Sequence, residues 1–174
     1  MSDTAPRLWR AAEITVSDSR GRDGRGDPSG DVIVERLADL PPRVVARRAV
    51  IDSVDEIRSA VLGCVDAADI VVVTGGTGLG PRDVTPQALL SLLDYEVPGL
   101  AEVMRHDGVG STPHAMLSRQ VAGVINGTLI VSLPGNPRAV AECLDAVWAA
   151  LPHALALLQG DTRHPGEDAH HLPG

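Results

Sequence analysis

One stretch of the chain, residues 71–86, restricts the fold more than any other. It opens with Val71-Val72-Val73, an apolar β-branched run that predicts a buried strand, and it continues into a turn with four glycines. Thr85-Pro86 then predicts a helix start, with Thr85 as N-cap and Pro86 at the first helical position. A strand that passes through a glycine loop into a helix presents backbone N–H groups to an anion. Arg82 and Asp83 lie inside this loop, where one can hold a phosphate and the other a cation or a donor.

Two common phosphate-binding motifs are excluded. The dinucleotide pattern G-x-G-x-x-G fails, because counting from Gly76 places Pro81 where the third glycine belongs. The Walker pattern needs a lysine, and all fifteen basic residues of this chain are arginine, which also excludes Schiff-base chemistry. A glycine-rich turn that merely connects a strand to a helix remains open on these residues alone.

The composition indicates one domain with an aliphatic core. The chain has 174 residues, 44% of them hydrophobic, with no Phe, one Tyr and two Trp. A net charge of −8 argues against a nucleic-acid partner. No apolar run approaches the ~20 residues of a membrane span, and the N-terminus lacks the apolar core of a signal peptide, so we expect a cytoplasmic protein with no membrane partner. Cys64 and Cys143 are expected to be reduced, buried small hydrophobes.

The first half of the chain alternates strands with helices. The pattern predicts strands at Ala11–Ser17 and Arg43–Val50, and helices after the Gly26–Gly30 loop and from Ser53 to about Ala67. Ser53-Val54-Asp55-Glu56 has the form of a capping box. Apolar residues at helical spacing mark the inward faces of the two helices, namely Val32, Ile33, Leu37 and Leu40 in the first and Ile57, Val61, Leu62 and Val65 in the second.

The second half repeats this order and adds a hairpin. Helices are predicted at Val84–Leu93 and from Val97 onward. Two apolar runs flank Asn126-Gly127, which is the strongest two-residue hairpin signal, so antiparallel strands are expected on either side of it. Asn136 is placed to cap a further helix that Pro137 starts and Pro152 kinks or divides. The recurring strand–loop–helix order predicts a three-layer α/β/α sandwich whose sheet is mostly parallel and partly mixed.

Several polar residues lie where strands end or helices begin. Asp52 follows a predicted strand, and the carboxyl ends of strands form the ligand crevice of an α/β sheet. The alternative role for Asp52 is stabilisation of the following helix through its dipole. Asp18 and Ser29 fit either a site or a helix cap, as does Ser118.

Seven short motifs resemble one family. The run from Thr74 to Pro86 is similar to the signature of the Mog/MoaB family of molybdenum cofactor biosynthesis, which includes the G domain of gephyrin. Its active members are molybdopterin adenylyltransferases. The matching segments extend from about Ser17 to Leu144, most of the chain, and are V-S-D ending at Asp18, D-x-S-G ending at Gly30, T-G-G-T-G from Thr74, R-D-V-T-P from Arg82, P-G-x-x-E-x-M-R from Pro98, L-S-R ending at Arg119 and L-P-G-N-P from Leu133.

The resemblance implies a reaction and a set of residues. The terminal phosphate of molybdopterin would attack the α-phosphorus of ATP, giving adenylylated molybdopterin and pyrophosphate. Asp52 and Asp83 would be catalytic and would bind Mg²⁺. The residues expected to contact the substrates ATP and molybdopterin are Asp18, Ser29, Thr74, Gly75, Gly76, Thr77, Gly78, Arg82, Ser118, Pro134, Gly135 and Asn136.

The resemblance also leaves alternatives. The family usually has an acidic residue after the T-P pair, whereas this chain has Gln87, and some close relatives lack the transferase activity. A non-catalytic molybdopterin-binding or scaffold protein is therefore a second hypothesis, and a nucleotide-hydrolysing relative of the competence-damage family is a third. A homo-oligomer, most simply a trimer, and a contact with the pathway's molybdate-insertion enzyme are implied as well. We expect a flexible N-terminus over residues 1–9, one domain over 10–159 and a disordered tail over 160–174.

Overall fold

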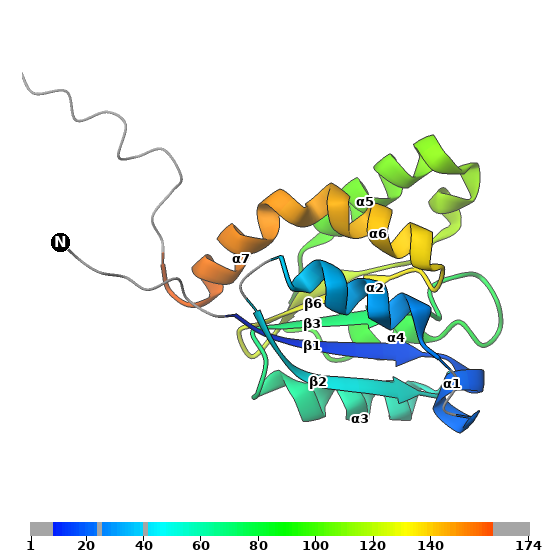
Figure 1. The fold of residues 1–174 in the computed structure, drawn as a ribbon, viewed down its shortest axis with the longest axis horizontal. Helices are drawn as coiled ribbons and strands as arrows, with labels where there is room; N and C mark the ends of the chain where they lie inside the picture. The colour runs from blue at the N-terminus through cyan, green and yellow to red at the C-terminus, as the bar shows by residue number, and fades with distance from the viewer. Residues whose placement is uncertain (1–8, 24–25, 40–41, 162–174) are drawn as a thin grey trace, which may run out of the picture.

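In the part of the chain that the structure describes, six strands form one mixed sheet in the order β2-β1-β3-β6-β5-β4 (Figure 1). The computed structural model describes residues 9–23, 26–39 and 42–161. Strands β2, β1, β3 and β6 run parallel, whereas β5 pairs antiparallel with both β6 and β4. The strands are β1 (Trp9–Val16), β2 (Pro42–Val50), β3 (Ile70–Thr74), β4 (Tyr95–Glu96), β5 (Ala122–Ile125) and β6 (Thr128–Leu133).

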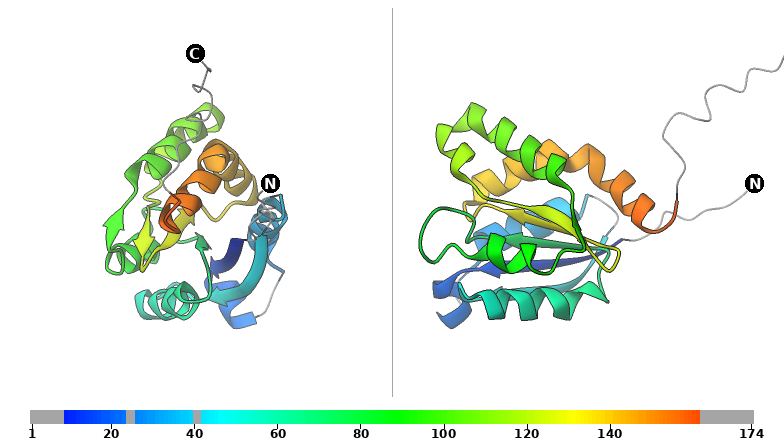
Figure 2. Two further views of the ribbon diagram at one scale, coloured as in Figure 1. Left: turned by 90° about the vertical axis from the view of Figure 1, so that its left-hand side faces the viewer. Right: turned by 180° about the vertical axis from the view of Figure 1, so that it is seen from behind.

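Helices cover both faces of the sheet (Figure 2). One face carries α2 (Pro28–Leu37), α5 (Pro98–Ser111), α6 (Pro137–Val147) and α7 (Leu151–Leu158). The other carries α3 (Val54–Val65) and α4 (Thr85–Leu90). The remaining helical segments are α1 (Asp18–Asp23), the 3₁₀ turn η1 (Pro113–Leu117) and the 3₁₀ turn η2 (Trp148–Ala150). The three-layer α/β/α sandwich expected from the sequence is therefore confirmed.

The sheet divides the interior into two hydrophobic cores. Successive side chains of β3 point alternately into the two cores. Ile70 and Val72 pack under α2, α5 and α6, and Val71 and Val73 pack against α3 and α4. All five residues of β3 are buried, as expected of a strand in the interior of the sheet. Cys64 and Cys143 are both free and buried, one in each core, as expected.

Local signals in the second half of the chain predict the structure well. β5 and β6 form the expected hairpin, and Asn126 and Gly127 both have the positive φ (48° and 77°) that such a tight turn requires. Asn136 caps α6, because its side chain accepts hydrogen bonds from the N–H groups of Arg138 and Ala139. The last helix is divided as expected, with Pro152 in the first turn of α7.

Helix starts are the main corrections. Val84 is the N-cap of α4, and the Thr85 hydroxyl instead donates to the carbonyl oxygen of Gly75 at 2.8 Å. Ser53 occupies the N-cap position of α3, but its side chain makes no capping bond, so the predicted capping box is wrong. The predicted inward residue Leu62 is 49% exposed, and Cys64 lies in the core in its place. The short helix α1, which begins at Asp18, and the short strand β4 were not among the predicted elements.

The helical run Pro137–Leu158 bears on the expectation that the protein has no membrane partner. The run has 22 residues, and an 18-residue stretch within it has a mean hydropathy of 1.3, so by length and composition alone it could cross a membrane. Core helices meet the same criterion, and this run supplies Leu144, Val147 and Leu151 to the core under α2. It is weak evidence for a membrane.

The expectations for the two ends of the chain fall largely outside the described residues. β1 begins at Trp9, at the edge of the N-terminal segment expected to be flexible, and the described residues end at Asp161. The expected tail over 160–174 lies almost entirely outside the described residues.

Candidate functional site

Four loops meet at the carboxyl ends of the parallel strands. The chain leaves β1 for β2 on one side and later returns to place β3 on the other side of β1, which makes a switch point between β1 and β3. Ligands of open α/β sheets bind in the crevice at such a point. Asp18, the first residue of α1, follows β1, and Asp52 follows β2. The glycine loop 74–83 starts at the last residue of β3, and Pro134–Asn136 follow β6, so the predicted residues from distant parts of the sequence lie at one edge of the sheet.

The glycine loop has a backbone shape that only glycine permits at its base. Gly75 and Gly76 have φ values of 96° and 63°. A Cβ atom on Gly75 would lie 2.3 Å from the carbonyl oxygen of Val16, and one on Gly76 would lie 2.5 Å from the Thr85 hydroxyl. Close approach to β1 and to α4 therefore explains why two successive glycines stand here.

The loop leaves donors available to a ligand. The N–H groups from Gly76 to Leu79 make no hydrogen bond with any residue that the structure describes. These residues line a pocket of about 480 Å³, together with Asp83, with the η1 segment and with the loop after β6. A row of such N–H groups beside a pocket suits an anionic ligand such as a phosphate.

Two carboxylates lie on either side of this loop. Asp52 and Asp18 exchange hydrogen bonds, since the N–H of Asp18 donates to Oδ2 of Asp52 at 2.9 Å and the N–H of Asp52 donates to Oδ1 of Asp18 at 3.1 Å. The second oxygen of Asp52 faces Gly76, where it would lie 3.3 Å from an added Cβ. Asp83 reaches the loop from its far end and accepts a hydrogen bond from the N–H of Gly80 at 2.8 Å.

The two aspartates are close enough to interact. Burial raises the pKa of Asp52, and the negative charge of Asp83 raises it further. The described residues contain no cluster of three His, Cys, Asp or Glu side chains suited to a metal. A cation held here would therefore have two carboxylates and several waters as ligands, which is the ligand set that Mg²⁺ commonly takes.

Arg82 lies beside Asp18, the residue that is hydrogen-bonded to Asp52. Its guanidinium forms an ion pair with Asp18, and its side chain is 66% exposed. In the structure the arginine thus faces a carboxylate at the sheet edge, and its exposure leaves it able to meet a phosphate as well.

Two predicted site residues hold the second loop in place. The Thr74 hydroxyl donates to the carbonyl oxygen of Pro134 at 2.7 Å, and the Ser29 hydroxyl donates to that of Gly135 at 2.8 Å. Both side chains are buried. Together with the bond from the N–H of Gly75 to the Leu133 carbonyl, at 3.1 Å, they join the loop after β6 to the glycine loop. The hydroxyls of Thr74 and Ser29 therefore shape the pocket wall.

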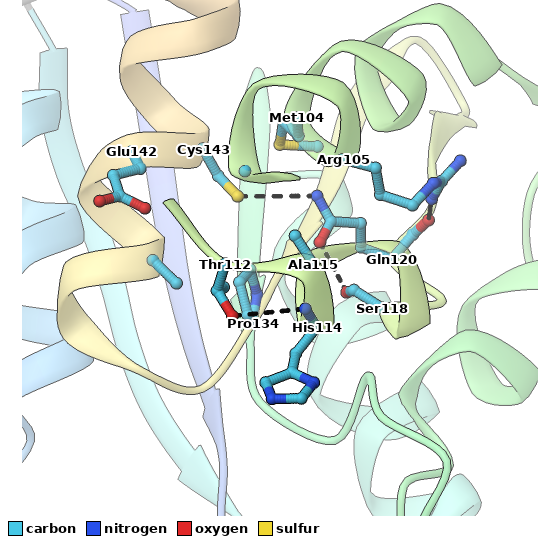
Figure 3. A pocket seen from close by; sticks show the side chains of 12 residues that line it. Met104, Arg105, Thr112, His114, Ala115, Ser118, Gln120, Pro134, Glu142 and Cys143 are labelled. Carbon is cyan, nitrogen blue, oxygen red and sulfur yellow. Dashed lines mark hydrogen bonds between the residues drawn. The ribbon is translucent and has the colours of Figure 1, made fainter. Parts of the chain in front are cut away.

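The segment after α5 forms the opposite wall. Ser118 lines the pocket, donates to Oε1 of the Gln120 side chain at 2.7 Å and lies 3.4 Å from the Thr77 hydroxyl. Gln120 in turn donates to the Cys143 sulfur at 3.7 Å, inside a neighbouring cavity of about 170 Å³ (Figure 3). Burial raises the pKa of the Cys143 thiol, which keeps it neutral.

The sequence did not identify every residue of the site. His114 and Leu117 line the larger pocket, Gln120 lines the smaller neighbouring cavity, and Arg119 bonds to the glycine loop. Figure 3 shows the His114 ring pointing away from Cys143. The sequence indicated these four residues only through their nearness to Ser118 along the chain. No local pattern shows which strand end a 3₁₀ turn will cover.

Known proteins with this sequence pattern identify the family. A family model described as "Probable molybdopterin binding domain" matches residues 12–153. A protein of Helicobacter pylori strain J99 named molybdopterin adenylyltransferase is 38% identical over 152 residues, which cover 85% of this chain and 86% of that protein. The chain belongs to the Mog/MoaB family of molybdopterin-binding domains.

Other members of the Mog/MoaB family agree in fold and differ in length. The crystal structure of the molybdopterin biosynthesis enzyme MoaB from Thermus thermophilus superposes with a TM-score of 0.82 at 46% identity, covering 88% of this chain and 98% of that one. A molybdenum cofactor biosynthesis bifunctional protein of Synechococcus elongatus is 37% identical, and the match covers 86% of this chain but 47% of that relative. The protein CinA of Thermoplasma acidophilum, at 19% identity and a TM-score of 0.64, shares the fold alone.

Proposed function

We propose that the protein is a molybdopterin adenylyltransferase that transfers AMP from ATP to the terminal phosphate of molybdopterin. The observation that carries the proposal is the convergence of Asp52 and Asp83 on one glycine loop, where the N–H groups from Gly76 to Leu79 bond to no described residue. Relatives named for this activity match most of the chain. Adenylyl transfer needs placement of two phosphate groups and neutralisation of their charge, which a loop of donors and a carboxylate pair supply.

In the proposed reaction a terminal phosphate oxygen of molybdopterin forms a bond to the α-phosphorus of ATP. The bond from that phosphorus to the bridging oxygen breaks, and pyrophosphate leaves with the electron pair. The loop N–H groups would hold the phosphate oxygens, and Arg82 would stabilise the charge that develops on them. Asp18 keeps Asp52 oriented through their paired hydrogen bonds.

The aspartate pair fits a magnesium ion. Burial raises the pKa of Asp52 and the negative charge of Asp83 raises it further, and a divalent cation held by the two carboxylates would offset their repulsion. Bound there, Mg²⁺ would neutralise charge on the transferred phosphate. Asp52 and Asp83 would hold it, with water filling its other positions.

Further assignments complete the proposal. A cytoplasmic location suits an enzyme that consumes ATP. Because a domain like this one forms about half of a relative named bifunctional, a separate protein with the pathway's next activity, molybdate insertion, is the natural partner.

We also propose a homotrimer. Light scattering at micromolar protein concentration tests the oligomer, and a monomer at every concentration would refute it.

The assay of purified protein with Mg-ATP separates the candidate functions. Pyrophosphate release that depends on molybdopterin is the result expected of the transferase. Release of phosphate from ATP alone would indicate the hydrolase. Tight molybdopterin binding without ATP turnover would indicate a binding protein.

A further inference from the structure

Arg119 connects the wall of the pocket to the glycine loop at three points. Its N–H donates to the carbonyl oxygen of Thr77 at 2.8 Å. Its side chain donates from Nε to the carbonyl oxygen of Gly78 at 2.8 Å and from Nη2 to that of Asp83 at 2.5 Å. The two side-chain bonds therefore close on the loop just before and just after its outer part, residues 79–82.

The outer part of the loop has little else to fix its position. Leu79 is 66% exposed, and Gly80, Pro81 and Arg82 are exposed as well. Two hydrogen bonds join Gly80 to Asp83. The N–H of Asp83 donates to the carbonyl oxygen of Gly80 at 3.0 Å, and the N–H of Gly80 donates to the Asp83 carboxylate at 2.8 Å. They set the shape of the turn but do not join it to another element. Arg82 does reach another element through its ion pair with Asp18, but an ion pair of so exposed a side chain contributes little. The Asp83 carboxylate is carried by this turn, so its place in the crevice depends on how the turn is held.

We propose that Arg119 is a positioning residue that holds the outer turn of the glycine loop so that Asp83 faces Asp52. Its catalytic consequence rests on the proposed function. A guanidinium suits this task because its rigid planar fork donates to two carbonyls at once. A lysine ammonium is a single point charge and can keep one of the two bonds in good geometry.

The test compares Arg119→Ala and Arg119→Lys with a matched control, Arg58→Ala. Arg58 is also half-buried and donates one side-chain bond, to the Ser91 hydroxyl at 2.6 Å, on the α3 side of the sheet. We expect kcat for pyrophosphate release to fall about a hundredfold in Arg119→Ala, because a misplacement of about 1 Å costs that much, while KM for molybdopterin changes far less. Arg119→Lys should recover part of the loss, and Arg58→Ala should retain the wild-type kcat.

Hydrogen exchange on the free protein tests, without requiring activity, whether the Arg119 hydrogen bonds hold the loop. In Arg119→Ala the amides of Gly80 and Asp83 should exchange about tenfold faster or more, as expected when hydrogen bonds from a charged group are lost. The amide of Gly75, which is bonded to Leu133 on β6, should be unaffected. Unchanged exchange at Gly80 and Asp83 would overturn the proposal.

The possible failures are distinguishable. Faster exchange with a wild-type kcat, or a lower melting temperature with an unchanged kcat per folded molecule, would show that Arg119 serves stability alone and would overturn the positioning role. A wild-type protein that releases no pyrophosphate would refute the proposed function, and the exchange result would still decide whether Arg119 holds the loop.

Discussion

Among single residues, Glu13 is the least expected, because it is a carboxylate in the middle of the sheet. It is 1% exposed on β1. The Thr15 hydroxyl lies 2.6 Å from an oxygen of Glu13 and also 2.6 Å from an oxygen of Asp27. One hydroxyl has one proton to donate, so the second short contact requires a proton on a carboxyl group. Burial raises the pKa of Glu13 and the charge of Asp27 adds to the rise, while the Thr15 hydroxyl and Arg47, at 3.4 Å, offset it in part.

The raised pKa of Glu13 predicts a pH dependence of stability. A folded-state pKa above the unfolded one gives a contribution that is complete below the unfolded value, ~4.3, and is lost as pH rises through the folded value. Glu13→Gln is neutral at every pH. We therefore expect the free energy of unfolding of the wild type to fall relative to Glu13→Gln as pH rises from about 4. Urea unfolding of both proteins across a pH series measures this. A difference that stays constant with pH would contradict it.

Asp83 carries the second prediction at this scale. Asp83→Asn keeps an oxygen that can accept from the N–H of Gly80, so the turn and molybdopterin binding should survive. It removes the charge, and we expect adenylyl transfer to fall by roughly 10²–10³. Asp52→Asn should act similarly, and the double variant should lose less than the sum of the two effects, since both residues would serve one metal. Independent, additive losses would contradict a shared site.

At the scale of elements, the α6 cap offers a test of local structure. Asn136 accepts from two N–H groups at 2.9 and 3.3 Å, and those groups would be left without a protein partner in Asn136→Ala. We expect a loss of about 1 kcal/mol in the free energy of unfolding. Asn136→Asp keeps the accepting oxygen and is the control. Equal stability of the alanine and aspartate variants would contradict the cap.

Elements were predictable where the signal was local. The pairs Asn126-Gly127 and Asn136-Pro137 specify their local structures without help from distant residues. The hairpin and the start of α6 are therefore predictable from the sequence. Thr85 was misassigned because its hydroxyl is drawn to the carbonyl oxygen of Gly75, ten residues away, once the loop folds back. The helix α1 was missed since its run of glycine, arginine and aspartate lacks apolar periodicity.

At the scale of the whole molecule, the sheet separates two cores. Ile33 lies in the core under α2 and Ile57 in the core under α3, and both are fully buried. Each Ile→Val substitution should cost about 1 kcal/mol, and the costs should add within about 0.5 kcal/mol in the double variant. Ile57→Val with Ile130→Val, which share a core, is the comparison pair. Urea unfolding measures all of these. Strong coupling between Ile33 and Ile57 would contradict two separate cores.

The location of the site was predictable from the topology, and its internal bonding was not. The carboxyl-end rule brought Asp18, Asp52 and the glycine loop together because each follows a parallel strand. The bond from Ser29 to Gly135 joins residues 106 positions apart, and the Arg119 side-chain bonds join residues 36 and 41 apart. No local sequence pattern indicates such long-range hydrogen bonds, so only the folded structure shows them.

The central claim is that the aspartates and the glycine loop form a site for adenylyl transfer. The most direct measurement is pyrophosphate release by the purified protein with Mg-ATP, with and without molybdopterin, beside Asp83→Asn. We predict release that requires molybdopterin and that falls roughly 10²–10³ in the variant, with molybdopterin binding retained. Molybdopterin binding without pyrophosphate release by the wild type, or equal release by Asp83→Asn, would contradict the account.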